Sequence, residues 1–203
     1  MAGIIVVHGA PGAGKTTQSR KLSTYLIEGR QIRHISAGER LRAIRNGEFQ
    51  SKYGIEVNSP NAPDPLDHQL VNKVIFESIA LCPPDSIILV DGYPCFIEAV
   101  GPFLEALRED NHLFLGCLNL QISQETSIIR LSARGIRQGE RVIEINENVS
   151  ERRYREHMLH TPKTIGKLGE MAPIININAE LSREEVWQSF NDAFEKLVRN
   201  YIR

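Results

Sequence analysis

The chain has almost no net charge and few cysteines. Its 203 residues include 24 lysines and arginines against 25 aspartates and glutamates, which gives a formal net charge of -1. This balance provides no overall field to attract nucleic acid or an anionic membrane, so a local cluster of arginines requires a local anion. The three cysteines, Cys82, Cys95 and Cys117, lack the paired C-x-x-C spacing that holds zinc, and they indicate a reducing compartment.

Long hydrophobic runs and internal repeats are also absent. No apolar run approaches the length of a transmembrane helix, and the stretch at residues 4–7 is too short for a signal peptide. A hydrophobic fraction of 41% and a charged fraction of 24% are ordinary for a globular domain. We therefore expect one domain over residues 1–203, monomeric and cytoplasmic, with neither a membrane nor nucleic acid as its partner.

A glycine-rich segment near the start of the chain predicts phosphate binding. Residues 9–16 fit the pattern G-x-x-x-x-G-K-[ST], between a strand-like run at 4–7 and a helix predicted over about 14–28. The glycines let backbone N–H groups approach phosphate oxygens, and the positive end of the helix dipole faces the same place. Lys15 adds positive charge, and Thr16 offers a hydroxyl ligand for Mg²⁺. The residues expected to bind the triphosphate of ATP are Gly12, Ala13, Gly14, Lys15, Thr16 and Thr17.

Short apolar runs recur along the chain and predict a parallel sheet. They are rich in β-branched residues and lack alternation, as in strands that are covered on both faces. Alternation of these runs with helical stretches predicts a three-layer α/β sandwich around a central five-stranded parallel sheet. The runs lie at residues 4–7, 86–90, 113–120 and 174–177, with a weaker fifth candidate at 31–35.

Three helices have recognisable ends or faces. Gly29 is expected to cap the first helix, and a second helix is expected over 65–81. The C-terminal helix starts with a capping box formed by Ser182 and Glu185. Its apolar stripe predicts core packing rather than a cofactor site, and it consists of Trp187, Phe190, Phe194, Leu197 and Tyr201.

Two polar segments interrupt the alternation of strands and helices. Residues 43–65 are rich in glycine, asparagine and proline, and residues 135–149 are polar between two predicted helices. In an α/β sheet the ligand binds at the carboxyl edge of the strands, where such connections emerge. We expect both segments to close over a bound nucleotide.

One carboxylate follows a predicted strand beside the phosphate loop. Asp91 comes directly after the run at 86–90, at its carboxyl end. An isolated aspartate after a strand is often only a turn residue. Together with the loop, Asp91 is predicted to act with Thr16 on the Mg²⁺ side of the phosphates.

Arginines gather in the second half of the chain. Planar guanidinium groups grip the oxygens of a phosphoryl group during its transfer, so this concentration favours phosphoryl-transfer chemistry. The alternative is a solvated basic face that nearby glutamates balance. The arginines are Arg130, Arg134, Arg137, Arg141, Arg152, Arg153 and Arg155.

Two helical histidines, His157 and His160, lie three residues apart without a third candidate metal ligand, so we expect them on a solvated face. His8, at the end of the first strand, is expected to be a packed, hydrogen-bonded side chain rather than a proton carrier.

Four motifs in this order resemble the adenylate kinase family of nucleoside monophosphate kinases. They are GAPGAGKTTQ at 9–18, HISAGERLR at 34–42, DGYP at 91–94, and RLSARG at 130–135 with RVIEINENVSERRYREH at 141–157. The resemblance covers nearly the whole chain. It implies a P-loop NTPase fold with a monophosphate-binding insert at about 37–66 and a short lid at about 135–149. It also implies transfer of the γ-phosphate of ATP to a nucleoside monophosphate, with ATP and Mg²⁺ as cofactors.

The resemblance also implies roles for individual residues. Lys15 should contact the transferred phosphate, Arg130 should cover the adenine of ATP, and Arg42 should bind the acceptor phosphate with Ser36, Gly92 and Tyr93 in the same acceptor site. The arginines that should surround the transferring group are Arg134, Arg141 and Arg153. No general base is needed, because an acceptor phosphate is already a nucleophile.

The chain departs from the family pattern around the acceptor. Cys95 stands where the family usually has an arginine that clamps the monophosphate, a loss of about 1.5 to 3 kcal/mol that Arg45 or Lys52 would have to offset. Ala37 makes its segment resemble the uridylate/cytidylate kinase version, and residues 96–99 lack a base-reading amide. Two alternatives therefore stay open: a kinase of another small metabolite, or an ATP-binding protein whose acceptor site has decayed.

Overall fold

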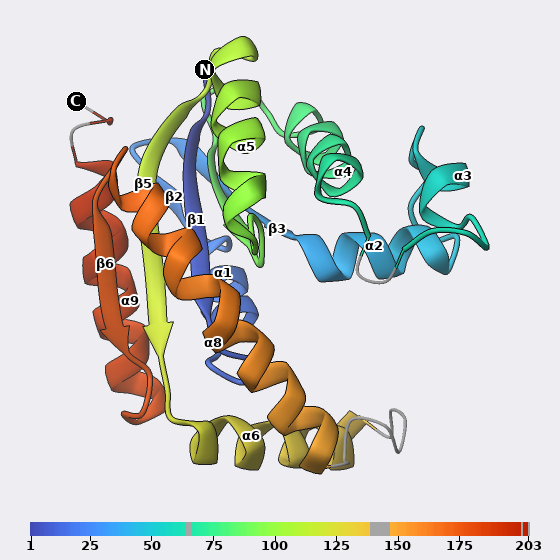
Figure 1. Cartoon of the computed structure of the whole chain (residues 1–203). Helices are drawn as coiled ribbons and strands as arrows, with labels where there is room; N and C mark the ends of the chain where they lie inside the picture. Colours follow the sequence, from blue (N-terminus) through green and yellow to red (C-terminus); the bar gives the residue numbers. More distant parts are fainter. Residues whose placement is uncertain (64–65, 139–146, 200, 203) are drawn as a thin grey trace.

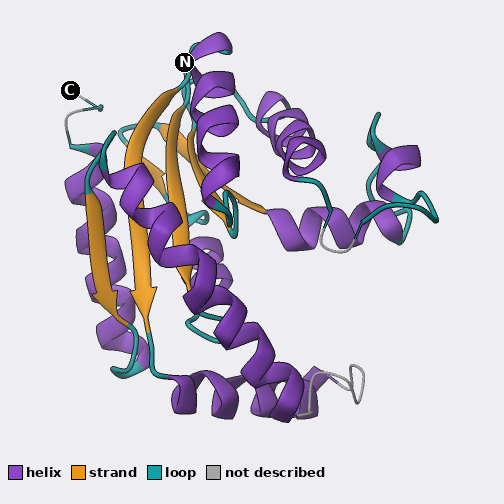
Figure 2. Cartoon of the chain, viewed as in Figure 1, coloured by secondary structure: helices purple, strands orange, loops and turns teal. Residues whose placement is uncertain are grey.

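The computed structural model describes residues 1–63, 66–138, 147–199 and 201–202. Six strands form one sheet in the order β2-β3-β4-β1-β5-β6, with helices on both faces (Figure 2). The strands are β1 (Gly3–Gly9), β2 (Leu26–Ile27), β3 (Arg30–Ser36), β4 (Ile87–Asp91), β5 (Leu113–Gln121) and β6 (Ile174–Asn178).

The five predicted parallel strands are confirmed, and a sixth was missed. Strand β2 pairs antiparallel with β3, so the sheet is not purely parallel. The first helix, α1 (Lys15–Leu22), is shorter than predicted because the chain turns after it to enter β2. Glu28 and Gly29 both have positive φ angles, 48° and 77°, as in a tight hairpin turn. Gly29 therefore joins β2 to β3, and the prediction that it caps the first helix is wrong.

Two hydrophobic clusters lie on opposite faces of the sheet. The first joins Leu22 of α1 and the buried face of α9 (Arg183–Val198) to the strands. The second joins the strands to α4 (His68–Ala80), α5 (Ile97–Glu109) and, through Leu168, α8 (Glu147–Gly169). Parallel strands need this cover on both faces, which explains why their apolar runs do not alternate.

Helix α9 forms as its sequence predicts. Ser182 and Glu185 make the reciprocal hydrogen bonds of a capping box. Phe190 and Phe194 are 0% and 1% exposed, and Leu197 is also buried. Trp187 and Tyr201, the latter beyond the end of the helix, are partly buried and pack against the same cluster, so the apolar stripe belongs to the core.

A third, smaller cluster lies beside the sheet. It joins α2 (Ala37–Arg45), α3 (Gly54–Val57) and the start of α4 through Ile44, Val57, Leu66 and Val74. Figure 1 shows α2 and α3 extending away from the sheet. The polar segment predicted at 43–65 therefore contains a short helix with its own apolar contacts.

The second polar segment is helical at both described ends. Helix α6 (Gln124–Gln138) includes residues 135–138, and α8 includes residues 147–149. The prediction that 135–149 is a connection between helices is therefore wrong for these residues. Arg141 lies outside the described residues, and Arg134 is described only as backbone of α6.

The hydropathy of the helices agrees with the absence of long apolar runs in the sequence. Over the described ranges, no helix combines the length and apolarity that a bilayer crossing demands.

Two isoleucines test the importance of the central strand. Ile5 on β1 is 0% exposed, whereas Ile55 on α3 is 90% exposed. We expect Ile5→Ala to lower the free energy of unfolding by about 2–5 kcal/mol, because it leaves a cavity between sheet and helices. The same change at Ile55 should alter it by no more than about 0.5 kcal/mol. Urea unfolding measures both, and similar losses in the two variants would contradict the assignment of the core.

Candidate functional site

The candidate site forms where three parallel strands end. In the sheet register Val7 of β1 and Ser36 of β3 both lie opposite Asp91 of β4. The loop after β1, the first turn of α2 and the end of β4 therefore meet at one edge of the sheet. This edge is where α/β proteins bind their ligands.

The loop after β1 requires glycine at two positions for different reasons. At Gly9, where φ is 147°, an added Cβ would lie 2.4 Å from the carbonyl oxygen of Leu120 on the neighbouring strand. Gly14 adopts φ 92° as the N-cap of α1, where no side chain caps the helix and the first turn carries no acidic residue. The first backbone N–H groups of α1 are therefore available to an anion. Ala13, buried within the loop, and Thr17, exposed in the first turn of α1, complete the predicted segment.

Helix α6 packs directly on this loop. The hydroxyl of Ser127 donates a hydrogen bond of 2.6 Å to the carbonyl oxygen of Pro11. An added Cβ at Gly12 would lie 3.1 Å from the carbonyl oxygen of Ser127 and 3.4 Å from the Cβ of Arg130. The structure thus places Arg130, half-buried, beside the loop.

Lys15 folds back over the loop that precedes it. Its Nζ atom donates to the carbonyl oxygens of Gly9 and Ala10, at 2.7 and 3.2 Å. Burial lowers the pKa of Lys15, and the negative charge of Asp91 opposes that shift. The ammonium group is therefore held at the loop by neutral acceptors.

Asp91 joins the phosphate loop to strand β3. The hydroxyl of Thr16 donates to its Oδ2 atom at 2.7 Å, and Nε2 of His34 lies 3.4 Å from the same oxygen. Burial raises the pKa of Asp91, but the hydrogen bond from His34, the charge of Lys15 and the hydrogen bond from Thr16 outweigh it. The pKa therefore lies below its ordinary value, and the carboxylate is ionised at neutral pH.

Sequence reasoning missed His34 as part of this cluster. Its side chain is 7% exposed and comes from β3, the least secure of the predicted strands. A polar residue near the carboxyl end of a predicted parallel strand was the available signal, because such ends converge on one edge of the sheet.

The predicted acceptor residues have mixed placements. Ser36 caps α2 by accepting a hydrogen bond from the backbone N–H of Glu39 at 3.4 Å, while Arg42 is exposed on α2. Gly92 is exposed and has φ 79°. Ser36 thus lies where β3 passes into α2, whereas Arg42 lies on α2, the first helix of the segment that extends from the sheet.

Tyr93 differs from the other predicted acceptor residues. Its side chain is 1% exposed, packs edge-on against Phe103 and donates a hydrogen bond of 3.1 Å to the carbonyl oxygen of His68. Burial raises its pKa. The side chain belongs to the core, so any contact of Tyr93 with a ligand has to come from its backbone.

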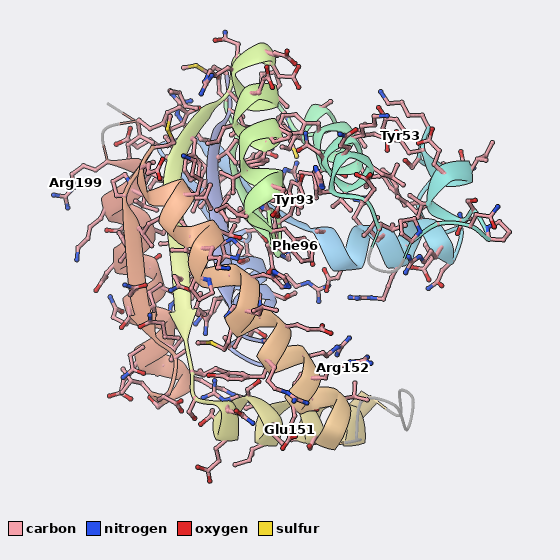
Figure 3. All side chains as sticks on the ribbon, viewed as in Figure 1. Tyr53, Tyr93, Phe96, Glu151, Arg152 and Arg199 are labelled. Carbon is pink, nitrogen blue, oxygen red and sulfur yellow. The ribbon has the colours of Figure 1, made fainter. Side chains whose placement is uncertain are left out.

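Cys95 is the residue at which the sequence departs from the family pattern, and its side chain is uncharged and only partly exposed. Cys95 is half-buried, and its carbonyl oxygen accepts a hydrogen bond of 3.3 Å from Thr164 on α8. Burial raises the pKa of its thiol to about 11, so the thiol carries no charge near neutral pH. Phe96 follows it at the start of α5 (Figure 3) and makes an edge-on contact with His160, with ring centroids 4.7 Å apart.

Apart from Arg141, which lies outside the described residues, the remaining predicted arginines belong to α6 and α8. Arg153 is exposed on α8, at the end that contacts α6. Its neighbour Arg152, labelled in Figure 3, forms an exposed pair with Glu156 at 3.8 Å. The described arginine side chains of α8 thus lie at one end of that helix. Arg130 of α6 is the predicted arginine that the structure places at the phosphate loop.

Two histidines close to Lys15 of the phosphate loop are uncharged at neutral pH. His8 is 3% exposed, and its Nε2 atom has no hydrogen-bond partner among the described residues, so it is packed as predicted but unpaired at that atom. Burial, followed by the charges of Lys15 and His157, lowers its pKa to about 3. His157 is half-buried and pairs with the hydroxyl of Thr161 at 2.9 Å, so the prediction of a solvated face is wrong for it.

Comparisons with known proteins give consistent results. The family model of an AAA domain, AAA_17, matches residues 8–150. Adenylate kinase of Campylobacter jejuni is 30% identical over 136 residues, which cover 66% of this chain and 68% of the relative. Adenylate kinase 1 of Nostoc is 27% identical over 183 residues, 90% of this chain and 93% of the relative. Adenylate kinase of Mycobacterium marinum is 32% identical over 132 residues, 64% of this chain and 70% of the relative.

The buried His8 makes stability depend on pH. The unfolded chain binds a proton on this residue near pH 6.5, whereas the folded chain keeps the ring neutral down to about pH 3. The folded state therefore loses stability as the pH falls through this window, by about 1.4 kcal/mol per pH unit. We expect His8→Leu to remove this contribution. Urea unfolding between pH 7 and 4 measures it, and an unchanged slope in the variant would contradict the assigned burial.

Proposed function

Because this chain belongs to the adenylate kinase family, we propose that it transfers the γ-phosphoryl group of ATP to a nucleoside monophosphate. The observation that carries the proposal is the hydrogen bond from Thr16 to the ionised Asp91, beside Lys15 on the phosphate loop. This contact joins the two parts that phosphoryl transfer in P-loop proteins requires, a phosphate-gripping loop and a carboxylate on the metal side.

The phosphates of ATP are proposed to lie at the N-terminus of α1. There the uncapped backbone N–H groups and the helix dipole favour negative charge. Lys15 would exchange the carbonyl oxygens of Gly9 and Ala10 for phosphate oxygens, and charged acceptors give stronger hydrogen bonds than neutral ones. Arg130, beside Gly12, is proposed to cover the adenine.

The residues present fit a Mg²⁺ ion at the edge of the loop. Thr16 and Asp91 offer a hydroxyl and an ionised carboxylate, the hard oxygen ligands that this ion prefers. The described residues hold no group of three or more His, Cys, Asp or Glu side chains that would form an all-protein metal site. Mg²⁺ typically takes one or two carboxylates and completes its shell with water and substrate phosphates. When bound, it would neutralise charge on the transferring group.

The acceptor side is proposed to be formed by the segment at 37–66, with Ser36, Arg42 and the backbone at Gly92 as its contacts. The segment at 135–149 is proposed as the lid, and Arg134, Arg141 and Arg153 as the arginines that stabilise the transferring phosphoryl group. A monomer acting in the cytoplasm on a small-molecule acceptor stays a prediction of the sequence.

Cys95 supports a second candidate function. A neutral thiol occupies the position where the family usually places an arginine on the acceptor phosphate. An acceptor with less negative charge, such as another small phosphorylated or hydroxylated metabolite, would suffer less from this change. Binding of ATP without turnover is the extreme form of the same alternative.

Activity on a panel of acceptors tests the proposal. We expect ADP to form from ATP and Mg²⁺ with at least one of AMP, CMP, UMP, GMP and dTMP. Lys15→Met should lower kcat by about 10²–10³-fold, because it removes a charge that acts on the transferred group. Lys196→Met, the same change at an exposed position of α9, should leave the rate unchanged. Full activity of the Lys15 variant would contradict the proposed mechanism. ATP binding without turnover on any of these acceptors would favour the second candidate function.

Restoring the family residue tests the role of Cys95. If a monophosphate binds beside this position, Cys95→Arg should lower the KM for the acceptor about ten- to hundredfold. A charged hydrogen bond to the phosphate contributes about 1.5 to 3 kcal/mol of binding free energy. Cys95→Ala serves as the control, because it removes the thiol without adding charge. Steady-state kinetics on the best acceptor measures both variants. A higher KM in the arginine variant would show that the acceptor is not a nucleoside monophosphate.

A further inference from the structure

A cavity lies between α8 and the sheet, beside the candidate site. Its volume is about 480 Å³, within the range of small-molecule sites. Figure 1 shows α8 crossing in front of β5. One wall consists of strand residues, among them Asn119, Gln121 and Asn176, and the other of α8 residues such as Tyr154, Met158 and Ile165.

This cavity is distinct from the nucleotide site. Side chains alternate along β5, so that Leu118 and Leu120 belong to the cluster under α1 and α9, while Cys117 belongs to the cluster on the α8 side. Asn119 and Gln121 therefore face α8, as Cys117 does. Of the phosphate loop, Ala10 alone contributes to the described lining.

The strand wall presents amide groups with unused hydrogen-bonding capacity. The side-chain NH₂ of Asn119 donates to Oδ1 of Asn176 at 2.8 Å. Within the described ranges, no hydrogen bond engages Oδ1 of Asn119 or the NH₂ group of Asn176. Asn119 is 8% exposed, but its carbonyl oxygen is not among the fully buried unpaired atoms of the described residues, so a ligand can reach it. The pair therefore offers one acceptor and one donor side by side.

The helix wall of the cavity contains a proline and a glycine, two residues that are unfavourable inside a helix. Pro162 lies inside α8 and has no N–H to donate to the carbonyl oxygen of Met158, and both residues line the cavity. Gly166, also in the lining, lies within the same helix, where glycine costs about 1 kcal/mol relative to alanine. An added Cβ there would meet nothing within 4 Å, so packing does not require the glycine. A larger side chain at this position would instead occupy the cavity.

The lining carries no charge. Its titratable members are Tyr154 and His157, and burial together with the charge of Lys15 lowers the pKa of His157 to about 4. His157 is therefore neutral near pH 7. A charged ligand would lose its hydration here without gaining a counter-charge, so the walls favour an uncharged one.

We propose that this cavity binds a small, uncharged, planar heteroaromatic molecule that carries an adjacent hydrogen-bond donor and acceptor. Free nucleobases and nicotinamide share this chemistry. The edge of such a ring pairs with the amides of Asn119 and Asn176, as asparagine does with a base edge. Its faces lie against the apolar side chains of α8. Ala10 and His157 connect the ligand to the phosphate loop and to the helix that carries Arg153.

Calorimetric titration with uracil and, separately, with nicotinamide tests the proposal. The variants are Gly166→Leu, which fills the cavity, and Gly101→Leu on α5, an exposed helical glycine whose added Cβ likewise meets nothing within 4 Å. We expect at least one probe to bind the wild-type chain and Gly101→Leu equally. Gly166→Leu should weaken that binding at least tenfold while the melting temperature does not fall, since both changes raise helix propensity. The probe that binds identifies which ring system the cavity accepts.

Two results would overturn the proposal: no binding of either probe to the wild-type chain, or equal binding to Gly166→Leu. Asn176→Ala provides a second measurement if Gly166→Leu does not fold, because Asn176 is exposed on the edge strand. It should weaken binding by removing one partner of the amide pair. Undiminished binding to Asn176→Ala would place the ligand elsewhere.

Discussion

The parallel pairing of β1 with β4 is the constraint on which the candidate site depends. It places Val7 opposite Asp91, so the loop that leaves β1 starts beside the carboxylate that ends β4. The hydrogen bond from Thr16 to Asp91 follows from this register. A shift by one residue would turn Asp91 to the other face of the sheet and separate the two groups. The buried apolar residues on both faces fix that register, because a slip would exchange side chains between two closely packed clusters that are shaped differently.

The same packing withdraws the ionisable groups of the site from much of their contact with water. Lys15, Asp91 and His8 all lie where burial opposes their charged forms, and their pKa values shift in response. Asp91 nevertheless stays ionised, because His34, Lys15 and Thr16 together outweigh the loss of water. Electrostatic attraction is stronger in such surroundings than in water, which suits a site proposed to bind polyphosphate. The histidines behind the loop are neutral and leave its positive charge to Lys15.

The two halves of the candidate site depart from the family pattern to different degrees. The proposed ATP side brings the loop, the end of α1 and the carboxylate of Asp91 together at one edge of the sheet. On the proposed acceptor side, the half-buried thiol of Cys95 is neutral where the sequence resemblance leads us to expect a cation, and the ring of Phe96 lies against His160. The side chain of Tyr93 is committed to the core. The choice of acceptor in the proposed function therefore depends on the surroundings of Cys95 and Phe96.

The sequence by itself determined the features that local chemistry encodes. The glycines of the phosphate loop, the four apolar strand runs and the capping box at Ser182 each depend on neighbouring residues, so their patterns can be recognised without a structure. Tertiary structure alone decided the rest. Strand β2 is two residues long and forms only because β3 pairs with it, and the contact of His34 with Asp91 joins two strands through the register of the sheet. The cavity beneath α8 likewise exists only after the helix and the sheet have met, because its walls come from segments far apart in the chain.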